Sequence, residues 1–190
     1  MKKAALHNLG CKVNAYETEA MQHLLEEAGY EIVPFTQKAD VYGINTCSVT
    51  NMADRKSRQM LHKAKKNNPD SIVVAAGCYV QTSEKEVLND LSVDIVIGND
   101  RKHDLVRLLE EYSLDSVNDT VDDINDGKHD FEELFIDQTK EHTRAFIKVQ
   151  DGCNQFCSYC IIPYARGRVR SRRFENVIAE VERLAANGFK

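Results

Sequence analysis

Three cysteines stand close together in the run GCNQFCSYCIIP. Cys153, Cys157 and Cys160 follow the spacing Cys-x3-Cys-x2-Cys, which differs from the Cys-x2-Cys pairs of zinc modules and redox dithiols. Zinc and ferredoxin sites normally take four protein ligands. Three thiolates can instead ligate three irons of a cubane cluster and leave the fourth iron open to a small molecule. The spacing therefore indicates an iron–sulfur site that binds a reactive ligand, with packed or zinc-structural cysteines as the alternative.

This spacing resembles the cluster signature of the radical S-adenosylmethionine (radical SAM) enzymes. The resemblance implies that Cys153, Cys157 and Cys160 hold a [4Fe-4S] cluster whose open iron binds the amino and carboxylate groups of S-adenosyl-L-methionine. The reduced cluster would cleave the sulfonium to give a 5′-deoxyadenosyl radical, while the protein supplies orientation and excludes water. Tyr159 stands where the family usually has an aromatic residue near the adenine, so we expect it to contact this cofactor.

The other three cysteines, Cys11, Cys47 and Cys78, are far apart in the sequence but follow similar apolar runs. These runs, AALHNLG, VYGINT and IVVAAG, are typical of buried strands, and the segments between them of helices. Loops at the carboxyl ends of parallel strands meet at one edge of a sheet, where ligands usually bind. We therefore predict that these cysteines converge. Taken alone they could equally be buried free thiols, but beside the first motif they are predicted to hold a second cluster.

The alternation of strands and helices predicts an α/β fold with a doubly wound parallel sheet. A first helix is expected from Asn14, with Asn14 and Glu17 as a capping box and Gly29 as its stop. Further elements are predicted in chain order: a helix from Asn51, a helix from Thr82 or Ser83, a strand at 93–97 and a helix at 105–112.

After the first domain, Arg144–Gln150 reads as a strand, followed by the cysteine loop and a helix that carries Val177 and Leu184. The resemblance implies that this is the first strand-loop-helix of a (β/α) radical SAM barrel, which is expected to be truncated because a full barrel needs about 250 residues. We therefore expect a fragment of an enzyme, with exposed apolar surface in its last segment and little turnover alone. The predicted division is an N-terminal domain at 1–112, an acidic linker at 113–142 and an incomplete radical SAM domain at 143–190.

Four segments carry a closer family resemblance: LGCKVNAYETE, NTCSVTN, GCYVQ and DGCNQFCSYCIIPYARGRVRSR. Together they resemble the radical SAM methylthiotransferases, and GCKVN is most similar to the bacterial branch that acts on N6-threonylcarbamoyladenosine in tRNA. The resemblance implies two [4Fe-4S] clusters, S-adenosyl-L-methionine, a tRNA anticodon stem-loop and an electron donor protein. It implies that one S-adenosylmethionine methylates a sulfur on the auxiliary cluster of Cys11, Cys47 and Cys78, and that a second activates the adenine carbon. The branches for isopentenyladenosine in tRNA and for a ribosomal-protein aspartate are the alternatives.

The formal net charge of −5 is unevenly distributed. Residues 113–142 contain ten acidic and two basic residues, which leaves 23 basic and 20 acidic residues elsewhere. The acidic segment lacks sustained periodicity and is interpreted as a surface linker.

Basic residues gather directly after the cysteine loop, where Arg166, Arg168, Arg170 and Arg172 alternate with other residues. Arginine suits bidentate phosphate contacts, so these four are predicted to bind the RNA backbone. Some of them could instead pair with the carboxylate of S-adenosylmethionine or with acids of the 113–142 segment. A non-catalytic α/β module that binds tRNA through such basic surfaces is the second functional hypothesis.

The sequence has no apolar run long enough to span a bilayer, and MKKAALHNLGC lacks the apolar core of a signal peptide. Cysteines at strand ends and in a ligand-like loop favour reduced thiols over disulfides. We therefore expect a cytoplasmic protein with no membrane partner.

Overall fold

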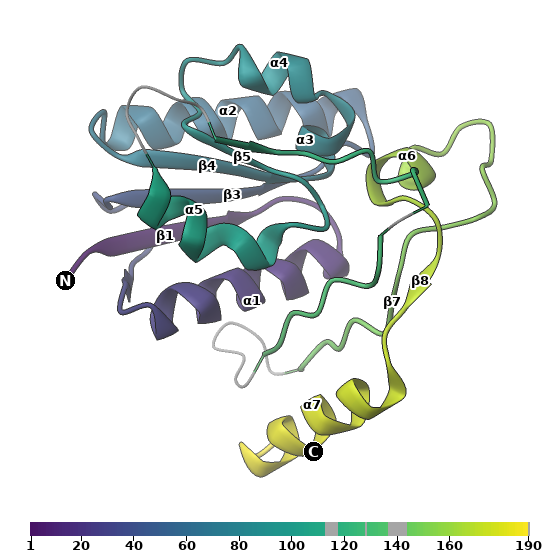
Figure 1. Cartoon of the computed structure of the whole chain (residues 1–190). Coiled ribbons are helices and arrows are strands. Elements are labelled where there is room, and N and C mark those ends of the chain that lie inside the picture. The colour runs from purple at the N-terminus through teal and green to yellow at the C-terminus, as the bar shows by residue number, and fades with distance from the viewer. Residues whose placement is uncertain (113–117, 128, 137–143, 190) are drawn as a thin grey trace.

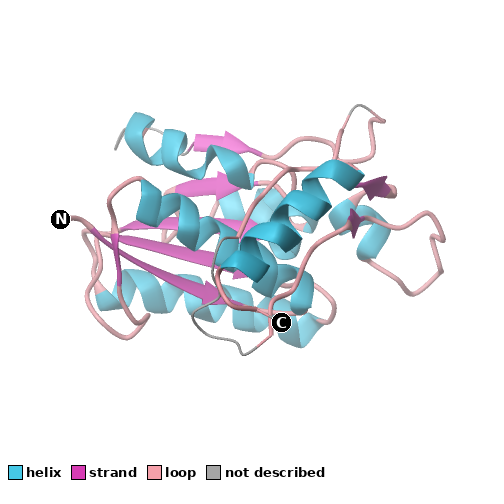
Figure 2. Ribbon diagram, turned by 90° about the horizontal axis from the view of Figure 1, so that it is seen from below, coloured by secondary structure: helices cyan, strands magenta, loops and turns pink. Residues whose placement is uncertain are grey.

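Six parallel strands form the central sheet of the computed structural model, which describes residues 1–112, 118–127, 129–136 and 144–189. The strand order is β2-β1-β3-β4-β5-β6, and the long arrows of this sheet point in one direction in Figure 2. The strands are β1 (Lys3–Asn8), β2 (Glu31–Ile32), β3 (Val41–Thr46), β4 (Ile72–Gly77), β5 (Ile95–Ile97) and β6 (Asn118–Thr120). This confirms the predicted doubly wound α/β sheet, whose order reverses beside β1 as in other folds of this kind.

Helices cover both faces of the sheet (Figure 1). On one face lie α1 (Lys12–Glu27), η1 (Lys102–Asp104) and α5 (Leu105–Glu111), and on the other α2 (Asn51–Asn67), α3 (Cys78–Thr82) and α4 (Glu84–Leu88). Successive strand residues alternate between the two cores: Val73 and Ala75 pack with α2 and α3, and Val74 and Ala76 with α1 and α5. Because both faces are covered, the strands read as continuous apolar runs rather than as an alternating pattern.

The predicted capping box at the start of α1 is wrong. Cys11 occupies the N-cap position, and the helix begins at Lys12, before Asn14. The Asn14 side chain is buried and reaches backbone carbonyls of two neighbouring loops, while Glu17 is fully buried among cations. Both side chains therefore bond to distant parts of the chain and do not form the predicted capping box.

Helix α3 begins at Cys78, earlier than the predicted start at Thr82 or Ser83, which corresponds to α4. Gly77 makes this abrupt turn possible, because its φ is +98° and a Cβ there would lie 2.4 Å from Asn45 Oδ1. The chain thus passes from β4 into a helix without a loop, and Cys78 stands in the first helical position.

The acidic segment does more than connect two domains. It supplies β6, which pairs in parallel with β5, and it buries Leu134 and Ile136 against Tyr16 and Ala20 of α1. The apolar residues of this segment are irregularly spaced among the acids, so they create no visible period. The domain boundaries at 112 and 142 stay a prediction.

The last part of the chain contains β7 (Gln150–Asp151), α6 (Ile162–Arg166), β8 (Arg170–Ser171) and α7 (Phe174–Ala186). The predicted strand at 144–150 is too long: a ladder forms only where Gln150 and Asp151 face Ser171 and Arg170 in antiparallel register. Helix α7 exposes Phe174, Ile178 and Val181, which is the apolar surface expected from the sequence. The barrel itself stays a prediction.

Within the described residues, no helix combines the length and the apolar character needed to cross a membrane.

Candidate metal centre

The three separated cysteines follow three neighbouring strands of the sheet. Cys11 lies in the turn after β1, Cys47 directly follows β3, and Cys78 directly follows β4. A Cβ at Gly10 would lie only 3.0 Å from Cys47 Sγ, so the first two loops touch. All six cysteines are free thiols. All three cysteines thus follow the carboxyl ends of neighbouring strands, and the loops of Cys11 and Cys47 touch. The predicted convergence of the three sulfur atoms stays a prediction.

Asn14 joins the loops that carry Cys11 and Cys47. Its Nδ2 donates to the carbonyl of Leu9 (3.0 Å) and to that of Thr46 (2.9 Å), the residue before Cys47. Its Oδ1 accepts from the Cys11 thiol at 3.4 Å. One buried amide, only 1% exposed, thus fixes the spacing of two predicted ligands.

Cys47 and Cys78 are each held by a further polar side chain. Ser57 of α2 accepts from the Cys47 backbone N–H (3.2 Å) and donates to its carbonyl (3.1 Å). Asn99, which follows β5, donates from Nδ2 to Cys78 Sγ at 3.6 Å. Sequence reasoning missed Ser57 and Asn99, because neither belongs to a local motif.

The second cysteine set lies on one loop between β7 and α6. The base of this loop closes through Cys153, whose N–H donates to the carbonyl of Gly167 at 3.0 Å, and Cys160 donates to the carbonyl of Cys157 at 2.9 Å. Phe156 has a φ of +46°, an uncommon value for a residue with a side chain. Such local strain is frequent in loops that hold a ligand.

Arg166, the last residue of α6, ties this loop to the N-terminal domain. Its guanidinium donates to both carboxylate oxygens of Glu17 (2.8 and 3.2 Å), to Asp151 (3.1 and 3.2 Å) and to Asn14 Oδ1 (2.9 Å). Helix α6 accordingly sits beyond the carboxyl edge of the sheet, next to α3 (Figure 1). The helix that follows the second cysteine set therefore packs at the edge of the sheet after which Cys11, Cys47 and Cys78 lie.

Two lysines complete this buried ionic cluster, which comprises Glu17, Asp151, Arg166, Lys102 and Lys148. The Lys148 ammonium lies 2.7 Å from Glu17 and 2.6 Å from Asp151, and the Lys102 ammonium lies 3.4 Å from Glu17. Three cations face two carboxylates, so the cluster as a whole carries an excess of positive charge close to the cysteines.

This charge arrangement shifts the titration of the buried groups. Burial alone would raise the pKa of Glu17, but Arg166, Lys102 and Lys148 outweigh it and hold that pKa well below its usual value. Burial likewise opposes ionisation of Asp151, and its cationic neighbours nevertheless lower its pKa. Burial raises the pKa of the Cys78 thiol, an effect that Arg166 partly offsets.

The four predicted RNA-contacting arginines occupy different environments. Arg166 and Arg172 are buried, at 4% and 6% exposure, and Arg170 bonds the carbonyl of Arg166. Arg172 pairs with Glu180 and with Glu133, so the alternative of pairing with acids of the 113–142 segment is confirmed for this residue. Arg168 is exposed. RNA contact by any of the four stays a prediction.

The aromatic residues of the cysteine loop differ in their surroundings. Arg168 lies over the ring of Phe156 at 5.0 Å, and Phe156 meets Tyr164 of α6 edge to face. Tyr159 is 91% exposed. Its predicted contact with a cofactor adenine stays a prediction.

The described residues contain no group of three or more His, Cys, Asp or Glu side chains placed to hold a metal ion. The three separated cysteines follow neighbouring strands, but the cysteine side chains do not form a ligand cluster in this structure. Their chemistry fits a thiophilic group, because thiolates are soft donors that select iron–sulfur clusters or zinc. The cations Arg166 and Lys102 would offset the negative charge of such thiolates.

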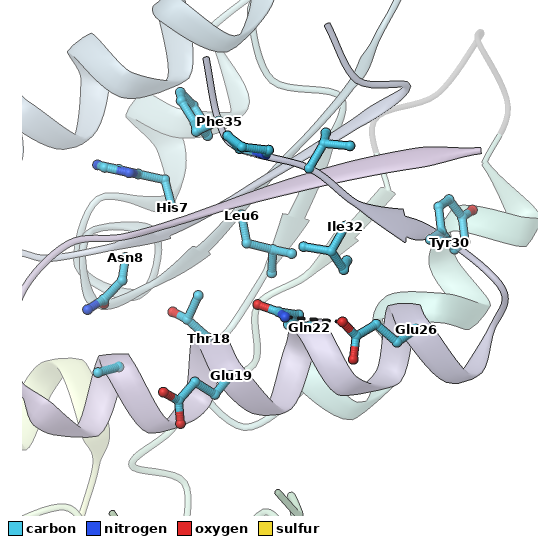
Figure 3. Close-up of a pocket in the computed structure, with 13 residues that line it drawn as sticks. Leu6, His7, Asn8, Thr18, Glu19, Gln22, Glu26, Tyr30, Ile32 and Phe35 are labelled. Atoms are coloured by element: carbon cyan, nitrogen blue, oxygen red, sulfur yellow. Dashed lines mark hydrogen bonds between the residues drawn. The ribbon is translucent and has the colours of Figure 1, made fainter. Parts of the chain in front are cut away.

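One cavity lies beside the carboxyl end of β3, and another lies beside the outer strands β1 and β2. The first, of about 240 Å³, adjoins Cys47 and is also lined by Gly10, Met52 and Lys56. A larger one of about 1050 Å³ lies between α1 and the β1–β2 edge, where Leu6 and Ile32 point toward α1 (Figure 3). The lining of the larger cavity includes none of the predicted site residues.

Acid should weaken the folded state through the buried carboxylates. Because the folded state lowers the pKa of Glu17 and Asp151, it binds fewer protons than the unfolded chain, and their stabilisation is present above about pH 4 and lost as the pH falls. The slope approaches about 1.4 kcal/mol per pH unit for each group. Urea unfolding of Glu17→Gln between pH 3 and 7 should show a flatter slope than the unsubstituted protein.

Glu175→Gln, at an exposed position of α7, serves as the control for the loss of one negative charge. It should reproduce the slope of the unsubstituted protein. Equal slopes for Glu17→Gln and the unsubstituted protein would show that the ionic cluster does not govern the acid response.

The sequence of the chain is similar to a protein family and to known proteins. Residues 3–98 match a family described as Uncharacterized protein family UPF0004. Across its full length the chain is 45% identical to the threonylcarbamoyladenosine tRNA methylthiotransferase MtaB of Bacillus subtilis, and it covers 42% of that protein. MtaB of Aquifex aeolicus is 43% identical over 99% of the chain and 46% of the relative.

A tRNA-2-methylthio-N(6)-dimethylallyladenosine synthase of Thermoanaerobacter sp. is 35% identical over 97% of the chain and 40% of its own length. The chain thus spans less than half the length of these relatives. The chain therefore belongs to the UPF0004 family, and its predicted resemblance to MtaB-like methylthiotransferases is confirmed.

Proposed function

We propose that this chain forms the cluster-binding part of a tRNA methylthiotransferase that acts on N6-threonylcarbamoyladenosine beside the anticodon. The observation that carries the proposal is the ionic contact of Arg166, which holds α6, the helix after the second cysteine set, against α1, whose N-cap is Cys11. A methylthio transfer needs a sulfur-bearing site and a radical-generating site close to one substrate atom. A contact between the helices that adjoin the two cysteine sets supports such an arrangement.

In this proposal Cys11, Cys47 and Cys78 hold an auxiliary [4Fe-4S] cluster, and the other three cysteines hold the radical SAM cluster. When bound, these groups supply electron transfer to S-adenosyl-L-methionine and a site for the transferred sulfur. The chain's own residues do the remaining work. Asn14, Ser57 and Asn99 orient the ligand loops, and the buried ionic cluster keeps α6 over the sheet edge.

The surface beside Cys47 supports access for RNA. The small cavity there is lined by the exposed apolar side chain of Met52 and by the cationic Lys56, both at the start of α2. An apolar surface next to a cation suits a nucleobase and its phosphate. The partners would be a tRNA anticodon stem-loop and an electron donor protein, in the cytoplasm.

The degree of sequence identity to enzymes named for each substrate supports the choice of N6-threonylcarbamoyladenosine. Identity is 45% and 43% to two enzymes named for threonylcarbamoyladenosine and 35% to one named for dimethylallyladenosine. The GCKVN segment around Cys11 points the same way. Isopentenyladenosine in tRNA and a ribosomal-protein aspartate stay as alternative substrates.

A tRNA-binding module without catalysis is the second candidate. Exposed basic residues on α2 (Arg55, Lys56, Lys63 and Lys66) and the exposed Arg168 favour it. This candidate predicts salt-dependent tRNA binding that does not require iron, whereas the enzyme requires iron at both cysteine sets.

Iron content tests the ligand assignment. Anaerobic reconstitution should give roughly eight irons per chain, as expected for two [4Fe-4S] clusters. Cys47→Ala and Cys157→Ala should each lower this number to about four, because each removes one ligand from a different set. Val49→Ala, at an exposed position beside Cys47, should retain all the iron.

Full iron retention in Cys47→Ala would refute its role as a ligand. Stoichiometric zinc with no iron–sulfur absorbance would instead identify a zinc-structured protein.

Nucleoside analysis tests the substrate. Deleting the gene that encodes this chain should abolish the 2-methylthio form of N6-threonylcarbamoyladenosine in tRNA, and its precursor should accumulate. Liquid chromatography with mass spectrometry of digested tRNA measures both. A gene carrying Cys47→Ala should fail to restore the product, and a gene carrying Val49→Ala should restore it. Loss of methylthio-isopentenyladenosine instead would assign the chain to the other tRNA branch.

A further inference from the structure

We infer that Asn99 is a positioning residue that sets the electronic environment of the Cys78 sulfur and links it to the loop of the second cysteine set. The inference rests on the proposed function, because it takes Cys78 as a cluster ligand. Asn99 lies in the turn after β5 and is fully buried. Its backbone N–H donates to Gln81 Oε1 at 2.9 Å, which fixes the main chain at this point.

The orientation of the Asn99 amide is determined by Lys102. The Lys102 ammonium, itself fully buried, lies 2.9 Å from Asn99 Oδ1 and 2.9 Å from the Asn99 carbonyl. An ammonium group can only donate hydrogen bonds, so the amide oxygen must face it. The two N–H bonds of Nδ2 must therefore point the other way.

On that other side are two acceptors. Asn99 Nδ2 lies 3.6 Å from Cys78 Sγ and 2.6 Å from the carbonyl of Ala165. One amide group thus serves the last cysteine of the first set and the helix that follows the second set. Ala165 precedes Arg166, so the contact lies next to the buried ionic cluster.

A hydrogen bond to a ligand sulfur has a predictable electronic effect. Reduction adds negative charge to a cluster and its sulfurs, and an N–H donor stabilises this charge, so the donor raises the reduction potential. Asn99 therefore makes the auxiliary cluster easier to reduce than it would be with an unbonded Cys78.

A residue with a purely structural role would affect stability and leave the potential unchanged. The reduction potential therefore separates the two roles. It should be measured in the chain with Cys153, Cys157 and Cys160 replaced by alanine, since only the auxiliary cluster then contributes. Anaerobic redox titration followed by electron paramagnetic resonance gives the potential, and iron content gives the occupancy.

In this background Asn99→Leu should shift the potential to a more negative value, because it removes the donor without adding charge. Asn99→Asp keeps an oxygen acceptor for Lys102. It tests the loss of the N–H donor to Cys78 if the leucine variant does not fold. Its shift should have the same sign and be larger, because the new carboxylate adds negative charge. Asn125→Leu is the matched control, because Asn125 donates to another α6 carbonyl, that of Pro163, at 2.9 Å. It should leave the potential unchanged.

Iron-loaded Asn99 variants whose potential equals that of the parent would overturn the inference and leave the proposed function standing. An equal shift in Asn125→Leu would also overturn it, since α6 docking alone would then explain the effect. Absence of iron from the parent, with Asn99 intact, would overturn the proposed function and this inference with it.

Discussion

The buried contact between Glu17 and Arg166 is the constraint on which the rest of this structure depends. The two residues are separated by 149 positions in the sequence and meet in a space closed to solvent. Removing one partner of a buried ion pair destabilises a protein by about 3–5 kcal/mol. Here Lys148 and Lys102 also pair with Glu17, and Asp151 also pairs with Arg166. Glu17 belongs to α1, whose N-cap is Cys11, and Arg166 ends α6, the helix that follows Cys160. The buried ionic contact therefore joins the helix after the first cysteine to the helix after the last one.

The features predictable from the sequence were the local ones. Apolar runs such as residues 72–76 identified the parallel strands, and a cysteine after each of three strands indicated a common edge. Both arguments need only chain order and the geometry of a parallel sheet. The helix expected from Asn51 begins there as α2, and Thr50 caps it by accepting from the backbone N–H of Ala53.

The features that sequence reasoning missed depend on distant partners. Asn14 and Glu17 have the spacing of a capping box, yet contacts from residues 46 and 166 decide what they do. Arg166, Arg168 and Arg172 look alike in the sequence, but two are buried with carboxylates and one faces solvent. The edge strands β2 and β6 have two and three residues, too short for a period to be seen. No sequence pattern near Asn99 predicts its contact with Cys78.

A double-mutant cycle on Glu17 and Arg166 tests the central claim most directly. The free energies of unfolding of Glu17→Gln, Arg166→Gln and the double variant would be measured by urea denaturation under anaerobic conditions. If the pair joins the two parts of the chain, the double variant should lose about 1–3 kcal/mol less than the sum of the single losses. Single losses that add to within about 0.5 kcal/mol would contradict the account, because the two residues would then act independently.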